Sequence, residues 1–298
     1  MLEVTNIRVR SFDLNYLDIY WEIKPCYEDV NQYEFDVLRA DSEFGEYRSI
    51  ATQLVDQYRV RDNSIRGQKS FYHNLYYRIV CRHRVSGDEA TFPKVGGANL
   101  GAPLDLAGLE MARINNLKLK EFTGRKMWVF SKKASGQSCS ACFDRVTSRK
   151  TKSRCANCFD TTWVGGFTAP VEVYAMIISP DETTVHADFG NIEIENTAIL
   201  TGNYPELFEG DIIVEAENLR WRVGSNIKKV KKSRAIIRQQ APIHRIPNGD
   251  IEYKLPINLS QQEIKELVAT PERNITNPQT VESAKLITAL NGAFGPDK

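Results

Sequence analysis

Leu17-Asp-Ile-Tyr-Trp-Glu-Ile23 alternates apolar and polar residues, with Leu17, Ile19 and Trp21 on one face. The same period of two recurs in Tyr33–Ala40 and in Leu75–Cys81, whose apolar faces carry Tyr33, Phe35 and Val37, and Leu75, Tyr77, Ile79 and Cys81. This period is typical of half-buried strands, and turn residues separate the three stretches. Short strands at this spacing predict an antiparallel β-sandwich over residues 1–97 and a mainly β protein.

Within residues 1–97 the chain resembles a fibronectin type III domain. Trp21 corresponds to the tryptophan of the family's second strand, and Tyr33–Ala40 followed by Glu46–Ile50 corresponds to the third strand and the next edge. Tyr77–Cys81 corresponds to the sixth strand. The family is a binding or spacer module without catalysis, so the resemblance implies that Trp21 is a core residue.

Four of the six cysteines form two C-x2-C pairs, Cys139-Ser-Ala-Cys142 and Cys155-Ala-Asn-Cys158, with twelve residues between them. Each pair places two thiolates on one side of a tight loop, and two such knuckles make a tetrahedral zinc site. The segment has few large apolar residues, so metal binding would supply its folding energy. We therefore expect a zinc ribbon over residues 125–166, inserted after a strand at Lys126–Phe130.

Two other interpretations of the cysteines are open. One is a pair of disulfides, which the lack of a secretion signal at the start of the sequence disfavours. The other is a redox role, which the lack of a strand–helix context disfavours. Because four cysteines close the coordination of a zinc ion, the metal would be structural rather than catalytic. Cys26 and Cys81 are expected to be small buried residues.

Residues 93–105 are rich in glycine and proline, which is typical of a linker. Asp105 at its end can cap a following helix. Leu106, Leu109, Ile114 and Leu117 then recur near helical spacing, so residues 98–124 read as a linker followed by a helix over 106–120. Beyond the cysteines, strand patterns predict a small antiparallel barrel over residues 167–258. The expected strands are Val171–Ile178, Thr184–Phe189, Ile192–Ile194, Asp211–Ala216, Leu219–Gly224 and Ala235–His244.

The hairpin pattern of Phe208–Val223 resembles the small barrels of tailed-phage head-to-tail joining proteins. The succession of helix, basic strand, two C-x2-C pairs around a basic turn, Gly165-Gly166 and Pro170–Tyr174 resembles phage virion proteins with an internal zinc ribbon, over about residues 105–257. The resemblance implies a structural protein of the virion neck, made in the host cytoplasm. It would form a homo-oligomeric ring that contacts portal, adaptor or tail proteins. A baseplate or tail-attachment protein is the nearest alternative.

Two short helices are expected in the C-terminal arm, residues 259–298. Ser260-Gln-Gln-Glu263 is a capping box before the first, and Asn277–Leu290 contains the second. Helices this short need a neighbour to pack on, so this C-terminal segment is expected to lie on another subunit.

The net charge of +1 is the sum of large opposing blocks. Residues 113–154 carry 12 basic and 2 acidic side chains, whereas residues 155–219 carry 12 acidic side chains and no Lys or Arg. Residues 220–245 carry 9 basic and no acidic side chains. Opposite blocks in one chain can meet between subunits, which would set the register and direction of a ring.

The basic block at 113–154 also admits a nucleic-acid interpretation. Basic residues around the cysteines would contact phosphates of packaged DNA or another nucleic acid: Arg145, Arg149, Lys150, Lys152 and Arg154. Aromatic residues are scarce there, since only Phe143 lies between the two cysteine pairs. A third reading is a solvated charged surface.

No residue pattern indicates catalysis. None of the four histidines, His73, His83, His186 and His244, stands at metal-binding or triad spacing, and the common nucleotide, hydrolase and metalloprotease motifs are missing. No run of about 18 apolar residues is present either, so we expect neither an enzyme nor a membrane-spanning protein.

Overall fold

The computed structural model describes residues 2–24, 29–65, 75–101, 105–144, 147, 149–187, 190–233 and 235–255. The described part is mainly β, as the alternating patterns predict, and contains one α-helix. The expected C-terminal helices at 259–298 lie outside the described residues, as do Cys26, His73 and Arg145.

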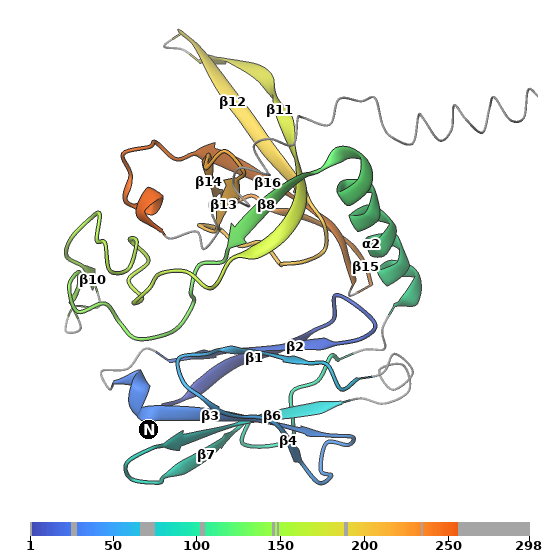
Figure 1. The fold of residues 1–298 in the computed structure, drawn as a ribbon, viewed down its shortest axis with the longest axis vertical. Helices are drawn as coiled ribbons and strands as arrows, with labels where there is room; N and C mark the ends of the chain where they lie inside the picture. The colour runs from blue at the N-terminus through green and yellow to red at the C-terminus, as the bar shows by residue number, and fades with distance from the viewer. Residues whose placement is uncertain are drawn as a thin grey trace, which may run out of the picture. The chain divides into compact units, whose positions relative to one another are not determined.

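Seven strands form two antiparallel sheets at the N-terminus (Figure 1). The strands are β1 (Val4–Arg10), β2 (Leu17–Ile23), β3 (Tyr33–Ala40), β4 (Arg48–Leu54), β5 (Arg59–Asp62), β6 (Tyr76–His83) and β7 (Glu89–Phe92). One sheet has the order β1-β2-β5 and the other the order β4-β3-β6-β7. The three strands predicted from alternation are β2, β3 and β6. Alternation does not signal the edge strand β4, because its side chains are mostly exposed; only the resemblance placed an edge there, at Glu46–Ile50, which overlaps it.

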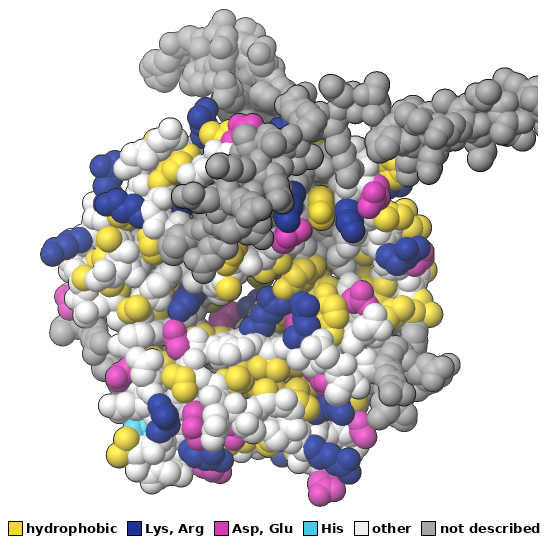
Figure 2. Space-filling model, viewed as in Figure 1, with side chains coloured by type: hydrophobic (Ala, Val, Ile, Leu, Met, Phe, Trp, Pro, Cys, Tyr) yellow, Lys and Arg dark blue, Asp and Glu magenta, His cyan; other side chains and the backbone are white. Residues whose placement is uncertain are grey.

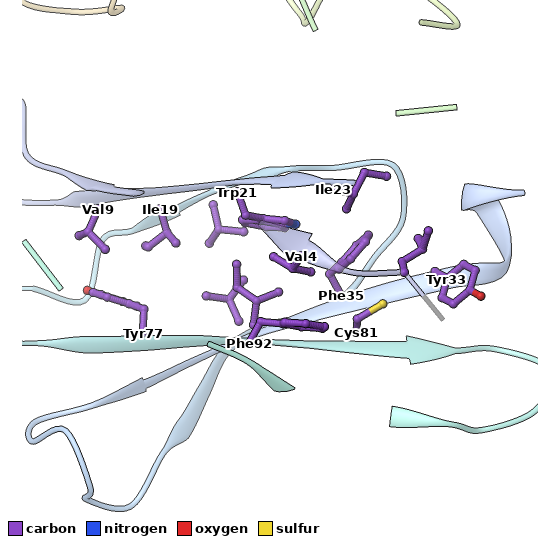
Figure 3. Close-up of a cluster of buried hydrophobic side chains, with 14 of the residues drawn as sticks. Val4, Val9, Ile19, Trp21, Ile23, Tyr33, Phe35, Tyr77, Cys81 and Phe92 are labelled. Atoms are coloured by element: carbon purple, nitrogen blue, oxygen red, sulfur yellow. The ribbon is translucent and has the colours of Figure 1, made fainter. Parts of the chain in front are cut away.

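Apolar side chains from the two sheets point toward one another and form a single core (Figure 3). Trp21 is 2% exposed, and its ring lies 6.0 Å from that of Phe35 and 6.4 Å from that of Tyr58. Cys81 is fully buried and free, as expected. Burial of aromatic side chains on this scale is the main stabilising term of such a module, at about 25 cal/mol per Å² of apolar surface.

A second body is a closed antiparallel barrel of six strands, in the cyclic order β12-β11-β8-β13-β14-β16. The barrel strands are β8 (Arg125–Phe130), β11 (Val171–Ala187), β12 (Gly190–Thr201), β13 (Ile212–Glu215), β14 (Arg220–Val223) and β16 (Ala235–Arg245), with β15 (Lys228–Lys232) added outside the ring on β16. Hydrogen bonding between β12 and β16 closes the ring. Its interior is apolar, with Met127, Val129, Ile199, Ile213 and Ala241 fully buried.

One sequence assignment is corrected by the strand pairing. Arg125–Phe130 was expected to belong with the cysteine segment 125–166, but it pairs with β11 on one side and with β13 on the other. The four residues Met127–Phe130 are all buried, which is typical of a central strand rather than of an edge. The barrel therefore begins before the cysteines, and the cysteine segment is a long loop between two barrel strands.

Helix α2 (Leu106–Lys118) precedes the barrel and packs on β16 (Figure 1). Asp105 caps it as predicted, since its carboxylate accepts a hydrogen bond from the Gly108 N–H at 2.9 Å. The helix contacts the barrel through Gly108, Leu109 and Ala112, whereas Leu106 and Leu117 are each 47% exposed. A five-residue π-helical turn, Leu119–Thr123, follows α2 and ends at Gly124.

Strands β11 and β12 are longer than predicted and extend beyond the barrel (Figure 1). Strand β11 pairs with β8 only at Val171–Ala175, and β12 pairs with β16 only at Ala198–Thr201. Past those residues the two strands pair, among the described strands, with each other alone, as far as Ala187 and Gly190. Residues 178–187 and 190–197 thus form two paired strands beyond the barrel, and we call the stretch 178–197 the arm.

Polar and aromatic contacts join the sandwich to the barrel. The fully buried carboxylate of Asp18 accepts hydrogen bonds from Arg59 at 2.7 Å and Arg61 at 2.8 Å. Both guanidinium groups lie over the ring of Tyr204, which precedes the barrel strand β13. Tyr204 also packs edge-on against Phe12, with 5.2 Å between ring centres. The paired arginines of the sandwich therefore stack on an aromatic residue of the barrel segment.

Candidate metal centre

The cysteine loop, residues 131–170, connects β8 to β11. Two isolated bridges, Lys132 with Phe167 and Ser138 with Trp163, hold its two limbs together. Between the cysteine pairs, β9 (Phe143–Asp144) and β10 (Arg149–Lys150) form a short antiparallel ladder. In the described part of the loop, regular structure is thus limited to this two-stranded sheet and isolated bridges, which leaves its compactness to the cysteines.

The two knuckles are built alike, because the sequence repeats a six-residue motif. Cys139-Ser-Ala-Cys-Phe-Asp144 and Cys155-Ala-Asn-Cys-Phe-Asp160 share four of six residues. In each, the phenylalanine N–H donates to the carbonyl of the first cysteine, at 3.0 Å for Phe143 and 2.9 Å for Phe159. The Phe-Asp that follows each cysteine pair is a local sequence signal that the two halves fold alike.

Backbone geometry shapes the second knuckle. Phe159, Asp160 and Thr162 have positive φ values of 47°, 65° and 73°, which non-glycine residues seldom adopt. The Asp160 carboxylate accepts hydrogen bonds from the N–H groups of Arg154 and Cys155, at 3.1 and 3.0 Å. Gly166 has φ 64°, and a Cβ there would lie 2.6 Å from the Cys158 carbonyl. These contacts bring the backbone close around the second pair of thiols.

All four thiols converge on one point. Their sulfur atoms lie within 4.8 Å of one another, and Cys139, Cys142 and Cys158 are buried. The Sγ atoms of Cys139 and Cys155 are 3.7 Å apart, and those of Cys142 and Cys158 are 3.2 Å apart. A disulfide needs about 2.05 Å, so all four are free thiols, and the disulfide interpretation does not hold in this structure.

The arrangement fits a tetrahedral metal ion. A tetrahedron with Zn–S bonds of about 2.3 Å places neighbouring sulfurs roughly 3.8 Å apart, close to the separations found here. Four sulfur donors with no oxygen donor suit a soft or borderline ion rather than calcium or magnesium. The sequence prediction that these four cysteines come together is confirmed, and the set is compatible with zinc.

The protonation of the thiols depends on the neighbouring groups. Burial raises the pKa of Cys155, but the Asn157 N–H and the other three thiols outweigh it and lower the pKa to about 7. Burial and a hydrogen bond with Cys158 raise the pKa of Cys142 well above its usual range. Four adjacent thiolates repel one another, so a cation is required before all four can ionise.

Of the predicted basic residues of the loop that the structure describes, two have acidic neighbours and two have none among the described ion pairs. Lys150 pairs with Asp160 at 3.0 Å, and Arg154 lies 3.4 Å from Asp250. Arg149 and Lys152 are exposed. On the face shown in Figure 2, Lys and Arg side chains stand in several separate groups with Asp and Glu between them.

Three contacts from the loop to the sandwich were not predicted from the sequence. The Ser135 hydroxyl accepts the N–H of Ile23 at 3.1 Å, and the Gln137 side-chain carbonyl accepts the N–H of Val30 at 2.9 Å. Lys133 forms an ion pair with Asp56 at 3.0 Å. Such contacts join residues about a hundred positions apart, and no local pattern signals them.

The described histidines give no catalytic arrangement. His83 bonds with Ser86 in the β6–β7 turn, at 2.9 Å, and its ring packs against Tyr33. His244 is exposed on β16. Among the helices that the structure describes, none is long and apolar enough to cross a membrane.

Comparison with known proteins assigns no relationship: no protein-family model matches the chain, and no curated protein matches it either.

Proposed function

We propose that this chain is a non-catalytic structural protein of a tailed-phage virion, part of the ring in the neck that joins head to tail. The observation that carries the proposal is the closed barrel with its arm, a two-stranded hairpin whose outer edges pair with no other described strand. Open edges of this kind are sites where another chain can add strands. A barrel with such a projection is suited to binding its neighbours rather than to catalysis.

The resemblance of Phe208–Val223 to head-to-tail joining proteins supplies the phage context. The structure supports it in one respect, since β13 and β14 pair as the expected hairpin. Asp211 at its start is fully buried and accepts the N–H groups of Phe208 and Lys132, each at 2.8 Å. The hairpin is thereby joined to the strand that leads into the cysteine loop.

Within this proposal the N-terminal sandwich is a fibronectin type III-like module. Strand order supports the resemblance: Trp21 lies on the second strand, Tyr33–Ala40 is the third, and Tyr77–Cys81 lies on the sixth. The module would contact another virion protein, and its buried Trp21 would serve the core.

The cysteine loop would be a structural zinc ribbon, held by Cys139, Cys142, Cys155 and Cys158. Zinc would supply a crosslink between the two knuckles. The hydrogen bonds that Ser135 and Gln137 accept from backbone N–H groups of the sandwich support a role in fixing the loop against that module.

Mass photometry and negative-stain imaging of the purified full chain test the proposal. A closed ring supports it. A monomer at micromolar concentration that binds DNA tightly at moderate salt overturns it in favour of a nucleic-acid-binding accessory protein. A baseplate or tail-attachment role shares the ring and would be separated by the position of the protein in labelled virions.

A further inference from the structure

The arm and the strand β15 are complementary in backbone and in charge. We propose that the arm of one copy adds to the edge strand β15 of the next copy, extending the sheet from one barrel into its neighbour. This inference rests on the proposed function in one respect: it takes the chain to assemble with itself. It names the two surfaces that meet and the direction of assembly.

The arm is incomplete as an isolated hairpin. Beyond Ile178 of β11 and before Ala198 of β12, the two strands pair with each other and with no other described strand. A two-stranded hairpin without further strands is marginally stable in water. Each of its outer edges therefore offers a row of backbone donors and acceptors for a third strand.

The sequence of the arm is strongly acidic. Residues 178–197 contain Asp181, Glu182, Asp188, Glu193 and Glu195 and no Lys or Arg. The register sets Glu182 directly opposite Glu195. Like charges at opposed positions destabilise a strand pair, so the arm gains stability from a basic partner.

Strand β15 supplies a basic edge. It reads Lys228-Lys-Val-Lys-Lys232, and within the described ranges it pairs only with β16. Lys229 is paired with Glu206 at 2.9 Å, whereas Lys228, Lys231 and Lys232 are exposed and Val230 is 44% exposed. None of the described carboxylates forms an ion pair with Lys228 or Lys231. Lysines on an unpaired strand edge repel most other strands and so prevent non-specific pairing. An acidic hairpin can still pair there, because its carboxylates neutralise the lysines.

One chain cannot make this contact with itself. Figure 1 shows β11 and β12 rising together from the barrel away from β15, and all three belong to the same hydrogen-bonded sheet. The contact must therefore join two copies, with the arm of one meeting a different surface on the next. Such a head-to-tail interface closes into a ring or continues as a filament, according to the rotation between copies.

Charge reversal on either surface tests the contact in the full-length protein. We expect Lys228→Glu with Lys231→Glu, and separately Asp181→Lys with Glu195→Lys, each to weaken self-association at least about tenfold, because like charges then face one another. Carrying all four substitutions in one chain should restore association to within about threefold of the original. Lys94→Glu with Lys118→Glu is the matched control for the lysine reversal, since both lysines are exposed elsewhere and the two variants change the net charge equally.

Sedimentation velocity at several concentrations gives the association constants, and far-UV circular dichroism with metal content shows that each variant is folded. Normal association of both single-surface variants overturns the inference and leaves the proposed ring intact, formed through another surface. Loss of association in every variant, without rescue in the fourfold reversal, also overturns it. A wild-type chain that stays monomeric overturns the proposed function together with the inference.

Discussion

The sandwich and the cysteine loop of this chain are held together by different means. The sandwich buries a continuous set of aromatic and aliphatic side chains, of which Trp21, Phe35 and Tyr77 are the largest. The apolar cluster described in the loop consists of the buried Cys139, Cys142 and Cys158 with the partly buried Cys155 packed against them. A segment with so little apolar surface cannot offset its conformational entropy by exclusion of water. We therefore predict that the sandwich folds through its own core, whereas the loop folds only when a metal ion binds its cysteines.

Removal of the metal ligands should have the largest effect, and it should be confined to the loop. We expect Cys142→Ser to abolish binding of one zinc per chain and to make residues 131–170 accessible to protease, because a structural zinc site contributes on the order of 10 kcal/mol to folding. Metal analysis and limited proteolysis with mass spectrometry measure both effects. The sandwich should remain folded, since its core shares no residue with the site.

Cys81→Ala is the matched control. It removes a buried free cysteine of the sandwich and leaves the four clustered thiols in place. It should keep one zinc per chain. If the wild-type protein holds no metal after purification with zinc, or if Cys81→Ala loses the metal as well, the comparison between the two regions fails.

Truncation of the sandwich core should be the next largest effect and should show the opposite pattern. Trp21→Ala removes a side chain that is 2% exposed and contacts two rings, so we expect a loss of about 3–5 kcal/mol in the free energy of unfolding. Chemical denaturation followed by circular dichroism measures it. Zinc content should stay at one per chain. A loss below about 1 kcal/mol would contradict the assignment of Trp21 to the core.

How far the sequence predicts this fold depends on how local each signal is. Leu17–Ile23 and Tyr33–Ala40 are strands with the predicted bounds, because the alternation of apolar and polar residues can be recognised within a few residues. Strand β15 was missed, and β4 was indicated only by the resemblance at Glu46–Ile50, since edge strands need not alternate. Arg125–Phe130 was attached to the wrong body for a related reason: a strand's partners are set by pairing across the chain, which no local pattern records.

The candidate site divides in the same way. The spacing of Cys139, Cys142, Cys155 and Cys158 was sufficient to predict their convergence. Their supports were not predictable, because Ser135 and Gln137 reach residues of the sandwich that are distant in sequence. The same holds for charge. The basic and acidic blocks were expected to meet between subunits, yet Lys126 with Glu172 and Lys150 with Asp160 join them within one chain.

Asp211 makes the junction between barrel and loop sensitive to pH. Burial raises the pKa of its carboxyl to about 6, although the N–H groups of Lys132 and Phe208 lower it in part. The folded chain therefore keeps a proton that the unfolded chain loses near pH 4, so this group makes the free energy of unfolding fall as pH rises from about 4 to about 6. Over this pH range the contribution of Asp211 to the free energy of unfolding falls by about 3 kcal/mol, at 1.36 kcal/mol per pKa unit.

Asp211→Asn isolates this term. Denaturation of the variant and the parent at several pH values between 4 and 7 gives the difference in their stabilities, in which acid effects common to both, such as thiol protonation, cancel. We expect the parent to lose stability relative to the variant as pH rises through that interval. A difference that stays constant with pH would show that the carboxyl of Asp211 is ionised throughout.

A smaller effect is expected where the backbone closes on the second knuckle. Gly166→Ala adds a methyl group 2.6 Å from the Cys158 carbonyl, at a φ of 64° that costs an alanine about 1–2 kcal/mol by itself. Gly165→Ala is the control, since its φ is also positive but its nearest neighbour is 3.8 Å away. In competition with a chelator, Gly166→Ala should release zinc at least about tenfold more readily than Gly165→Ala. Equal release would show that the close approach does not support the metal site.

The smallest predicted effect concerns the link between the two regions. Gln137→Ala removes the acceptor of the Val30 N–H, and an N–H left without its partner costs about 1 kcal/mol. We expect the free energy of unfolding of the sandwich to fall by that amount while zinc content stays unchanged. Gln57→Ala, which removes an exposed hydrogen bond within the sandwich, should change it by less than about 0.5 kcal/mol. If zinc removal from the parent lowers sandwich stability and zinc removal from Gln137→Ala does not, this bond transmits the folding of the loop to the sandwich. If zinc removal has no effect on the sandwich in either protein, the two regions are in contact but fold independently.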